Sequence, residues 1–596
     1  MFKSVIHMLF ETIDQYRHRD ALRFKRDGRI QAYSYEQFGQ MISKLAHGLS
    51  ALGLQKNDKI AILSNNRPEW TISDFAVFGM QGVVVPIYQT LPASQIAYIL
   101  NDSESRGIFV ENEVQYAKVQ EIKEKVPSLE FIIMYDQDTS DDQRVHGWDS
   151  VLEKGQEHLQ SHPNFLHESM AAINPEDVCS FVYTSGTTGD PKGVMLHHKG
   201  FVTDIVNAEA VLNLKETDVF LSFLPLSHLY ERLAGHWCPM YRGGAIHYAQ
   251  SIDTVVEDIA EAKPTVMVSV PRLYEKIAAR VQEQVENGPA LKRNLFYWAI
   301  GTGLQYHEDR QAGKVSKWQE MQYKIADRLV FYKIKQKLGG RFRYPIAGGA
   351  PLSVETLRFF EAVGLPIVEG YGMTETHLII TLTPAGQTRY GSCGKPIEGV
   401  QLQIAEDGEV LIKGDILMKG YFKKPELTDE VIDQEGWLHT GDIGYLDDNN
   451  FLFLTDRKKN IIVTSGGKNV APAPLEHKIK KSKYIDDVCL VGDKRKFISA
   501  LIIPNWEILQ KWARDNAVEA DDNQTLAGND RVKELIWQEI ETQNKDFARY
   551  EQVKNFTILG QPLSIEKGEL TPSLKIKRNV VEKNYKSIID DIYKEN

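Results

Sequence analysis

The sequence predicts an α/β protein with a large N-terminal domain of layered sheets and helices, a small antiparallel β subdomain, and a small α+β C-terminal domain. Its 596 residues exceed the roughly 100–200 residues of one ordinary domain. Hydrophobic residues make up 42% and charged residues 25%, which is usual for a globular protein with sizeable cores. Apolar strand-like runs alternate with amphipathic helical segments, a pattern typical of layered α/β folds.

The first predicted element is a helix near the N-terminus. Apolar residues follow helical spacing at Phe2, Val5, Ile6, Leu9, Phe10 and Ile13. We expect this helix to pack on its own domain, and a helix that touches a membrane is the alternative. His7 and the charged residues that follow argue against a cleaved signal peptide.

Helical and strand-like segments then alternate along the N-terminal region. The amphipathic segment 34–53 predicts a helix that ends at Gly53. A long helical stretch is predicted over roughly 273–340. Buried strands are predicted within residues 59–66, 82–88, 264–270 and 365–372.

The pattern changes near residue 400. Alternating apolar residues and turn glycines over 399–422 predict a small antiparallel unit. From about 456, a hairpin around 492–496, a helix over 531–544 and a basic tail predict a compact α+β domain. We therefore divide the chain into residues 1–455 and 456–596.

The net charge and the number and spacing of cysteines indicate which binding partners and which cellular compartment the sequence favours. The net charge of −11 argues against a broad nucleic-acid-binding face. The four cysteines contain no CxxC pair and no disulfide framework, which favours a reducing cytoplasm. No apolar run approaches the roughly 18 residues needed to span a bilayer. Peripheral contact with the inner face of a membrane is left open, as is the oligomeric state.

The segment YTSGTTGDPKGVML, residues 183–196, predicts a loop that binds phosphate. Backbone N–H groups in glycine-rich turns can converge on phosphate oxygens, hydroxyls add donors, and a lysine adds positive charge. A Walker loop is excluded because Lys192 is followed by Gly193 rather than Ser or Thr. The alternative is an ordinary surface turn that binds no ligand. The candidate phosphate-binding residues are Thr184, Ser185, Gly186, Thr187, Thr188, Gly189 and Lys192.

Further motifs follow in a fixed order after this loop. They are AGGAPLS at 347–353, EGYGMTET at 369–376, GWLHTGDIGYL at 436–446, TDRKKNIIVTSGGKNVAP at 455–472 and LTPSLKIKR at 570–578. Together with the loop, they resemble the AMP-forming adenylating enzymes, the superfamily of acyl-CoA synthetases, peptide-synthetase adenylation domains and beetle luciferases. The resemblance covers nearly the whole chain.

This resemblance implies a site for ATP and Mg²⁺. Thr184 and Glu375 correspond to the residues associated with magnesium, which takes few protein oxygens. Thr374 is expected to contact the α-phosphate, and Tyr371 to stack near adenine. The remaining nucleotide-binding candidates are the neighbours Gly370 and Gly372, the adenine-pocket wall Gly349, Ala350 and Pro351, and the ribose-binding pair Asp442 and Arg457.

The resemblance also implies a mobile C-terminal domain with two functions. Lys459 lies at the expected hinge, near 457–460, and Lys575 is expected to stabilise charge at phosphorus. Gly466 and Gly467 resemble the loop that approaches the pantetheine of coenzyme A. His228 resembles an acyl-pocket or gating residue, and a purely structural histidine is equally compatible with its surroundings.

The implied reaction joins an acid to ATP, giving acyl-AMP and pyrophosphate, and then transfers the acyl group to coenzyme A. Residues 271–353 resemble the long-chain fatty acyl-CoA synthetases specifically. A fatty acyl-AMP ligase that loads a carrier protein, and a ligase for medium-chain or aryl acids, are the alternatives within this class. A catalytically inactive lipid- or nucleotide-binding module is the alternative outside it. Phe223 and Trp237 are candidates to line an acyl tunnel and equally good core residues.

Overall fold

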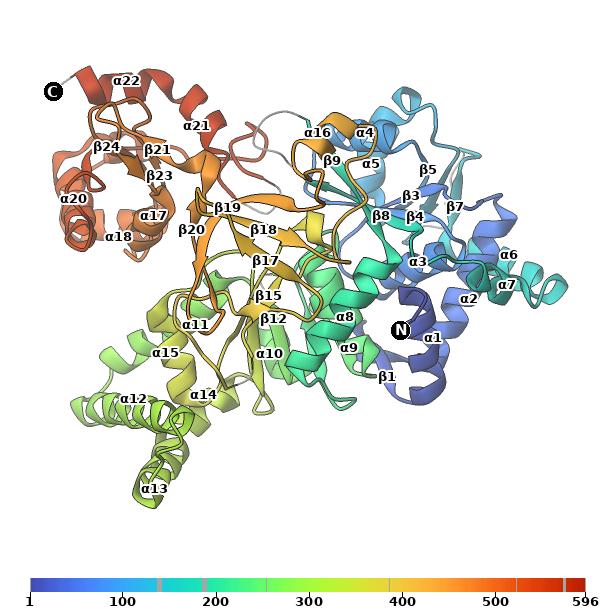
Figure 1. Cartoon of the computed structure of the whole chain (residues 1–596), viewed down its shortest axis with the longest axis horizontal. Coiled ribbons are helices and arrows are strands. Elements are labelled where there is room, and N and C mark those ends of the chain that lie inside the picture. Colours follow the sequence, from blue (N-terminus) through green and yellow to red (C-terminus); the bar gives the residue numbers. More distant parts are fainter. Residues whose placement is uncertain are drawn as a thin grey trace.

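The computed structural model describes residues 2–136, 142–184, 190–252, 254–384, 386–520, 522–571 and 575–594. It confirms the predicted α/β class, with layered sheets and helices in the N-terminal part and a separate α+β unit at the C-terminal end (Figure 1). Among the described residues, no helix is both long and apolar enough to cross a bilayer.

A seven-stranded sheet forms the first layer, in the order β7-β6-β5-β3-β4-β8-β9. Its strands pair in parallel except β9, which returns antiparallel to β8. The predicted strands within 59–66 and 82–88 are β3 and β4. The strand bounds are β3 Lys59–Leu63, β4 Val83–Ile87, β5 Ser105–Val110, β6 Phe131–Met134, β7 Val145–Gly147, β8 Val178–Thr184 and β9 Lys192–His197.

A nine-stranded sheet forms the second layer, in the order β16-β15-β14-β13-β12-β10-β11-β1-β2. Its centre is parallel, so the carboxyl ends of β12, β13 and β14 lie at one edge, where open α/β sheets bind ligands. The bounds are β1 Asp20–Arg26, β2 Arg29–Ser34, β10 Val219–Ser222, β11 Ala245–Tyr248, β12 Val266–Ser269, β13 Tyr344–Ala347, β14 Val368–Tyr371, β15 Thr381–Leu382 and β16 Lys395–Pro396.

Helices cover these sheets. The N-terminal helix α1 buries Val5, Ile6, Met8 and Leu9, which confirms that it packs on its own domain. The bounds are α1 Val5–Tyr16, α2 Tyr35–Ala51, α3 Pro68–Gly79, α4 Ala93–Ser103, α5 Glu113–Ile122, α6 Trp148–Ser161, α7 Phe165–Ala171, α8 His198–Leu212, α9 Cys238–Tyr241, α10 Val255–Ala262 and α15 Val354–Val363.

The predicted helical stretch 273–340 is present but divided. Its parts are α11 Pro271–Glu286, α12 Ala290–Gln311, α13 Lys317–Ala326, the π-helical turn Asp327–Phe331 and α14 Tyr332–Lys337. Gly288 and Pro289 separate α11 from α12, because a residue before proline disfavours helical backbone. Gly313, with a φ of 66°, lies between α12 and α13.

The C-terminal third contains the two units that the sequence predicts. The antiparallel unit is the four-stranded sheet β17-β18-β19-β20, which extends beyond the predicted 422 to Arg457. Its bounds are β17 Gln401–Ile404, β18 Glu409–Lys413, β19 Leu438–Leu446 and β20 Leu452–Arg457, with α16 Pro425–Asp429 between β18 and β19.

The final α+β unit has its own hydrophobic clusters. The predicted hairpin joins β23 to β24, and the predicted helix 531–544 is α20. The bounds are β21 Ile462–Val463, β22 Asn469–Val470, α17 Pro472–Ile479, β23 Ile485–Val491, β24 Ile498–Pro504, α18 Trp506–Asp515, α19 Asn523–Gly528, α20 Asp530–Asn544, β25 Val553–Ile558, α21 Arg578–Asn584 and α22 Lys586–Lys594.

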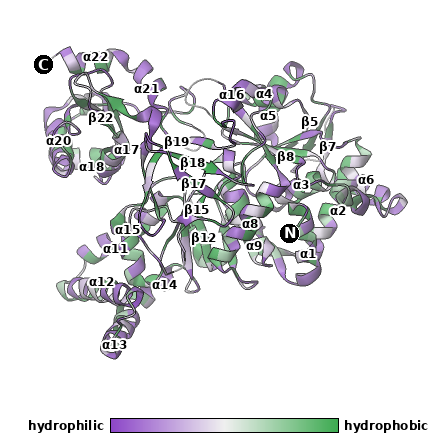
Figure 2. Ribbon diagram, in the orientation of Figure 1, coloured by the Kyte–Doolittle hydropathy of each residue, from purple (hydrophilic) through white to green (hydrophobic). Residues whose placement is uncertain are grey.

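Hydrophobic residues concentrate along the inner strands and the helices that cover them, whereas outer helices such as α21 are largely hydrophilic (Figure 2). One charged pair nevertheless lies inside the largest core. Arg232, fully buried in the π-helical turn Tyr230–Trp237, makes a bidentate ion pair with buried Asp74 of α3. Its third donor reaches the hydroxyl of Ser180 in β8 at 2.8 Å. The pair therefore joins α3, β8 and the turn that follows His228.

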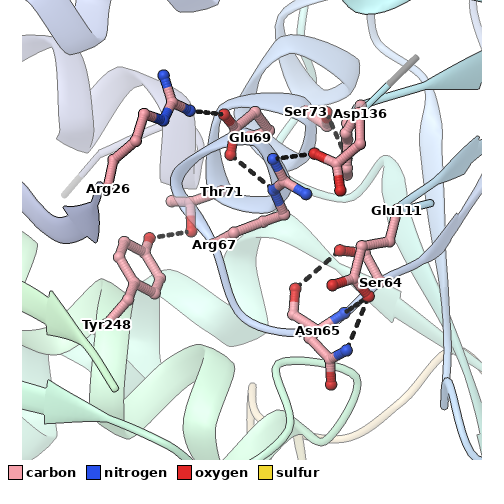
Figure 3. Close-up of polar contacts among 11 residues, drawn as sticks. Arg26, Ser64, Asn65, Arg67, Glu69, Thr71, Ser73, Glu111, Asp136 and Tyr248 are labelled. Carbon is pink, nitrogen blue, oxygen red and sulfur yellow. Dashed lines mark hydrogen bonds and ion pairs between the residues drawn. The ribbon is translucent and has the colours of Figure 1, made fainter. Parts of the chain in front are cut away.

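Polar side chains fix the loop between β3 and α3 (Figure 3). Glu69 accepts from Arg67 at 2.8 Å and from Arg26 at 3.3 Å, and Arg67 also pairs with Asp136 at 2.8 Å. These carboxylates raise the pKa of Arg67 further, against the effect of burial. The network keeps the start of α3 in place on both sheets.

Asn66 in the same loop binds the segment that leads to His228. Its amide donates to the hydroxyl of Ser222 at 2.8 Å and to the carbonyl of Leu224 at 2.6 Å. Its side-chain oxygen accepts from the Leu226 amide at 2.9 Å. Three bonds from one side chain therefore define the path of residues 222–226.

Buried neutral histidines predict a loss of stability in acid. Burial is the largest cause that lowers the pKa of His198 and of His377, each to about 3. In the unfolded chain, both histidines bind a proton once the pH falls below the usual histidine pKa of 6.5. The unfolded chain then binds more protons than the folded one, so the free energy of unfolding falls as pH falls from about 6.5 towards 3. We expect each to cost up to about 1.4 kcal/mol per pH unit. Urea unfolding midpoints between pH 7.5 and 4.5 test this.

The control uses one buried and one exposed histidine. H198Q should make the pH dependence shallower, because it removes one of the groups that titrates only when unfolded. H18N, at a largely exposed histidine, should leave the slope unchanged. An unfolding midpoint that is constant down to pH 4.5 in the unaltered protein contradicts the expectation.

Candidate active site

An aromatic hydroxyl, a carboxylate and a guanidinium meet where β14 approaches the antiparallel sheet. The hydroxyl of Tyr371 donates to Asp442 Oδ2 at 2.6 Å, and Arg457 Nε lies 3.0 Å from Asp442 Oδ1. Asp442 and Arg457 are register partners on β19 and β20, which explains their proximity. Burial and the neighbouring carboxylate raise the pKa of Tyr371 well above its usual range, so this hydroxyl stays a donor.

Glu375 lies in a second group of predicted residues, next to the phosphate loop. Its Oε1 accepts a hydrogen bond from the Tyr421 hydroxyl at 2.9 Å. The Lys192 ammonium lies 4.7 Å from the centre of the Tyr421 ring. Thr184 and Lys192 are register partners at the ends of β8 and β9. The structure thus brings together Thr184, Lys192 and Glu375, while Ser185, Gly186, Thr187, Thr188 and Gly189 lie outside the described residues.

The turn that carries Thr374 and Glu375 is held from behind by His377. Its Nδ1–H donates to the carbonyl of Ile416 at 2.7 Å, and its Nε2 accepts from the His197 amide at 3.0 Å. The amide of Ile379 donates to the buried carboxylate of Asp204 at 2.9 Å. His377 has a φ of 58°, in the left-handed region, so these bonds stabilise a costly backbone path.

Gly372 is required by the same turn. A Cβ at this position would overlap the carbonyl oxygen of Leu378. We expect G372A to lower the free energy of unfolding by about 1–3 kcal/mol and to reduce adenylation at least about tenfold, because Glu375 must shift with the turn. Thermal unfolding and acid-dependent exchange of pyrophosphate into ATP test this.

A matched control is available at Gly528, where a Cβ would meet nothing within 4 Å. G528A should change neither the unfolding temperature nor the exchange rate appreciably. Wild-type activity and stability in G372A would contradict the close approach that the structure shows.

The segment Gly349, Ala350 and Pro351 follows β13 and is exposed. Gly349 has a φ of 81°, and a Cβ there would meet open space, so the backbone is accessible to a planar ligand. Gly370, by contrast, packs against Leu382 of the neighbouring strand β15. Its role is therefore in strand packing.

Lys575 of the C-terminal unit lies near enough to the first group for the charges of Arg457 and Asp442 to act on its ammonium. Its backbone carbonyl accepts from the Thr571 amide at 2.8 Å, and its amide donates to the Thr571 hydroxyl at 3.0 Å. The residue is exposed to solvent, yet the surrounding protein lowers the pKa of its ammonium, as does Arg457, while Asp442 opposes the shift. Lys575 is therefore an ammonium at an open site that already holds Arg457.

The charge of the same ammonium acts on His228. Its Nδ1 accepts from the Tyr230 amide at 3.1 Å, which leaves Nε2 as the protonated nitrogen. Burial and the charge of Lys575 lower the pKa of His228 to about 4, so the ring is neutral near pH 7. Near pH 7, His228 is thus a neutral donor on which the charge of Lys575 acts.

Charges of the site also act on Lys459. Burial and Arg457 lower its pKa, whereas Asp442 and Glu375 raise it, so all of these charges act on one ammonium. Gly466 and Gly467 lie elsewhere, in the exposed turn between β21 and β22. Hydrogen bonds around that turn link Thr464 to Lys468 and Ser465 to Arg495, all within the C-terminal unit.

Contacts between the C-terminal unit and the N-terminal layers hold Lys575 in this position. His477 Nε2 lies 3.2 Å from the carbonyl oxygen of Pro351. Lys481 of the C-terminal unit pairs with Glu355 of α15 at 2.7 Å. Asp486 lies 3.5 Å from Arg272 of α11. The Pro351 carbonyl, which belongs to the predicted wall of the adenine pocket, thus also contacts the C-terminal unit.

Sequence reasoning missed two residues that shape the site. Tyr421 binds Glu375 and stacks under Lys192, and it follows Gly420 in a segment that pairs with β9. Asn66 fixes the path to His228. Tyr421 lies near the end of the segment 399–422, which the sequence predicts only as part of a small antiparallel unit. Asn66 ends the predicted strand range 59–66 and has no separate signal in the sequence.

These residues suit a nucleotide and a hard cation. Asp442, only 5% exposed, offers carboxylate lone pairs to hydroxyls, and Lys192 and Lys575 offer charge to phosphates. Within the described ranges, no cluster of three or more His, Cys, Asp or Glu is arranged to hold a metal. Magnesium needs no such cluster, because it binds through one or two carboxylates, phosphates and water. Glu375, with the Thr184 hydroxyl, fits that requirement.

Known proteins with similar sequences or a similar fold include several ligases. The long-chain-fatty-acid–CoA ligase FadD15 of Mycobacterium bovis is 35% identical over 555 residues, covering 93% of this chain and 90% of the relative. The long-chain-fatty-acid–CoA ligase ACSBG2 of Xenopus laevis is 32% identical over 624 residues, covering 99% and 84%. The crystal structure of the anthranilate CoA ligase AuaEII in complex with anthranoyl-AMP has a TM-score of 0.75 at 19% identity and covers 98% of each chain, which shows a shared fold.

Family models divide the chain in two. The model described as AMP-binding enzyme matches residues 9–422, and the model described as AMP-binding enzyme C-terminal domain matches residues 459–596. The first of these matches alone spans well over half of the chain. The chain belongs to the family of AMP-binding enzymes.

Proposed function

We propose that this protein is an AMP-forming ligase that activates long-chain fatty acids with ATP and transfers them to coenzyme A. The observation that carries the proposal is the contact of Tyr371 and Arg457 with Asp442, with Lys575 near enough for Arg457 and Asp442 to act on its charge. Curated relatives that are long-chain-fatty-acid–CoA ligases match almost the whole chain and support the substrate class.

The residues around Asp442 would bind the nucleoside of ATP. Asp442 accepts hydrogen bonds from ribose hydroxyls, and Arg457 keeps its carboxylate oriented through the 3.0 Å contact. Tyr371 fixes the other oxygen of Asp442 and presents its ring beside the base. The open face at Gly349 lets the backbone approach adenine.

Lys192 and Glu375 would act at the phosphates. Lys192 holds phosphate oxygens at the mouth of the β8–β9 loop, and Thr374 donates its hydroxyl to the α-phosphate. Glu375 and the Thr184 hydroxyl would hold magnesium, which supplies charge neutralisation on the phosphates when bound. The Tyr421 hydroxyl bond orients the Glu375 carboxylate.

In the first half-reaction, a carboxylate oxygen of the fatty acid attacks the α-phosphorus. The bond between this phosphorus and the pyrophosphate oxygen breaks, which gives acyl-AMP and pyrophosphate. Lys575 supplies an ammonium beside the charge that develops at phosphorus. The neutral His228 ring lies close to this ammonium, and its protonated Nε2 is suited to orient the carboxylate.

In the second half-reaction, the thiol of coenzyme A would replace AMP on the acyl carbon. We propose domains at residues 1–455 and 456–596, with rotation about a hinge near 457–460 that exchanges Lys575 for the turn at Gly466 and Gly467. K459P should then spare acyl-AMP formation more than thioester formation. Equal loss of both half-reactions would count against the rotation.

The fatty chain would require an apolar tunnel, since each buried CH₂ contributes about 0.8 kcal/mol. Trp237 is fully buried between aromatic side chains of the main core, so it is a core residue in this conformation. Phe223 is only half-buried and directly follows β10, towards His228. Phe223 is therefore the better candidate to contact the chain.

Measurement of pyrophosphate release across acids from acetate to stearate tests the proposed substrate class. We expect the highest kcat/KM with acids of about 14–18 carbons, since each added CH₂ contributes binding free energy. Free coenzyme A should then yield acyl-CoA. A maximum with short or aromatic acids would contradict long-chain specificity, and acyl-AMP formation without acyl-CoA would point to a carrier protein.

We also propose a cytoplasmic protein with peripheral contact at the inner face of the membrane.

A further inference from the structure

The helices α12, α13 and α14, with the turn between the last two, form a helical arm, residues 290–337, that projects from the body of the molecule (Figure 1). One face of the arm is anchored. Phe296, Ala299 and Phe331 are buried in the second hydrophobic cluster. Gly303 lets α12 lie directly against the backbone of Ala362 in α15, where a Cβ would clash. The arm is therefore a fixed part of the fold.

The opposite face of the arm is apolar and exposed. A stripe with helical spacing leaves roughly half of each side chain in solvent. It consists of Trp318 at 62%, Met321 at 45%, Ile325 at 44%, Leu329 at 45% and Tyr332 at 56%. The stripe extends for about 21 Å at 1.5 Å per residue. A contiguous stripe of large apolar side chains on a soluble protein marks an interaction surface.

The arm is also basic within an acidic protein. It contains ten Lys and Arg residues against four Asp and Glu, whereas the whole chain has 70 against 81. Lys324 and Lys335 pair with acids of the arm. Across the described part of the chain, Lys314, Lys317 and Arg328 have no acidic partner within 4 Å. These three cations lie beside the stripe and add no internal ion pair.

We propose that the exposed stripe of the helical arm docks on a bilayer that contains anionic lipids. Apolar side chains with a Trp and a Tyr, flanked by unpaired Lys and Arg, suit the boundary between acyl chains and anionic headgroups. A second copy of this chain fits less well, because two basic arms would repel each other. The inference deepens the proposed function, since a long-chain acid partitions into the bilayer.

Vesicle sedimentation tests the proposal without measuring catalysis. The protein is mixed with vesicles of phosphatidylcholine alone, or of equal parts phosphatidylcholine and phosphatidylglycerol. We expect at least about tenfold stronger partitioning to the anionic vesicles, weakened when salt rises from about 0.05 to 0.5 M. Equal binding to both compositions, or no binding to the anionic vesicles, would overturn the proposal.

Two variants assign the binding to the arm. W318Q/M321Q/I325Q and K314E/K317E/R328E should each lower partitioning about tenfold or more. Matched controls alter exposed apolar or basic residues elsewhere and should bind like the wild type. They are V114Q/I252Q/V256Q and K511E/R514E/K545E.

Measurements of enzymatic activity and of molecular mass distinguish a failure of this inference from a failure of the proposed function. Both arm variants should keep wild-type pyrophosphate release with octanoate, a soluble acid, so that loss of vesicle binding with retained ligation supports the proposal. Light scattering reports the oligomeric state. Arm variants that change a dimer into a monomer and still bind anionic vesicles would assign the stripe to a second copy and overturn it.

Discussion

Replacing Lys575 by alanine is expected to slow acyl-AMP formation about 100- to 1000-fold, which is the usual loss when one preorganised charge-stabilising donor is removed. The structure places this ammonium at the edge of the Tyr371, Asp442 and Arg457 group, in an environment that lowers its pKa. Pyrophosphate release with palmitate measures the step directly. The KM for ATP should change little, because Asp442 and Arg457 remain.

The second half-reaction provides the internal control. K575A should convert presynthesised acyl-AMP and coenzyme A to acyl-CoA at a nearly normal rate, because the ammonium acts only at phosphorus. K577A, at the neighbouring lysine, is the matched substitution and should leave both steps intact. Equal loss of both half-reactions, or full adenylation by K575A, would contradict the assigned role.

The protonation state of Lys575 gives the same step a pH dependence. Partial loss of solvation to the surrounding protein and the charge of Arg457 lower the pKa of Lys575 below the usual 10.5. Since the protonated form is the active one, adenylation should decline as pH rises through that lowered pKa, before an ordinary lysine would lose its proton. K575R should move the decline to higher pH because guanidinium keeps its charge. An alkaline limb that is identical in K575R would exclude Lys575 as its origin.

Local patterns predicted most of the elements, whereas the motif residues are a separate prediction. The periodicity of α1 and α2 and the apolar runs of β3, β4, β12 and β14 led directly to their observed positions, because side-chain spacing reports which face is buried. Of the motif residues, Tyr371 and Arg457 contact Asp442, and the charges of Arg457 and Asp442 act on Lys575. Family resemblance, rather than spacing, carried that second prediction.

Contacts between distant segments could not be predicted in this way. Tyr421 reaches Glu375 because residues 419–422 pair with β9, more than 200 positions earlier in the chain. Spacing within one segment carries no information about such a pairing. For the stripe from Trp318 to Tyr332, spacing within the segment gives the wrong expectation about burial. Its spacing is that of a buried face, and only the structure shows that it is exposed.

The second large effect concerns the buried pair of Arg232 and Asp74, whose partners lie 158 positions apart. R232M should lower the free energy of unfolding by about 3–5 kcal/mol, because it leaves a carboxylate buried without its counter-ion. Arg232 also lies 4.8 Å from the centre of the Trp237 ring, a contact that R232M removes. Urea unfolding followed by tryptophan fluorescence measures the loss.

A double substitution separates the unpaired charge from a loss of packing. D74L/R232M removes both charges and keeps apolar volume, so it should recover most of the stability that R232M loses, as apolar replacements of buried ion pairs often do. R17M, at the exposed pair of Arg17 and Asp14, is the control and should leave the unfolding midpoint unchanged. If the double variant is as unstable as R232M, packing rather than charge determines the loss. Because the turn that carries Arg232 begins two residues after His228, R232M should also reduce acyl-AMP formation, and D74L/R232M should restore it only as far as it restores the fold.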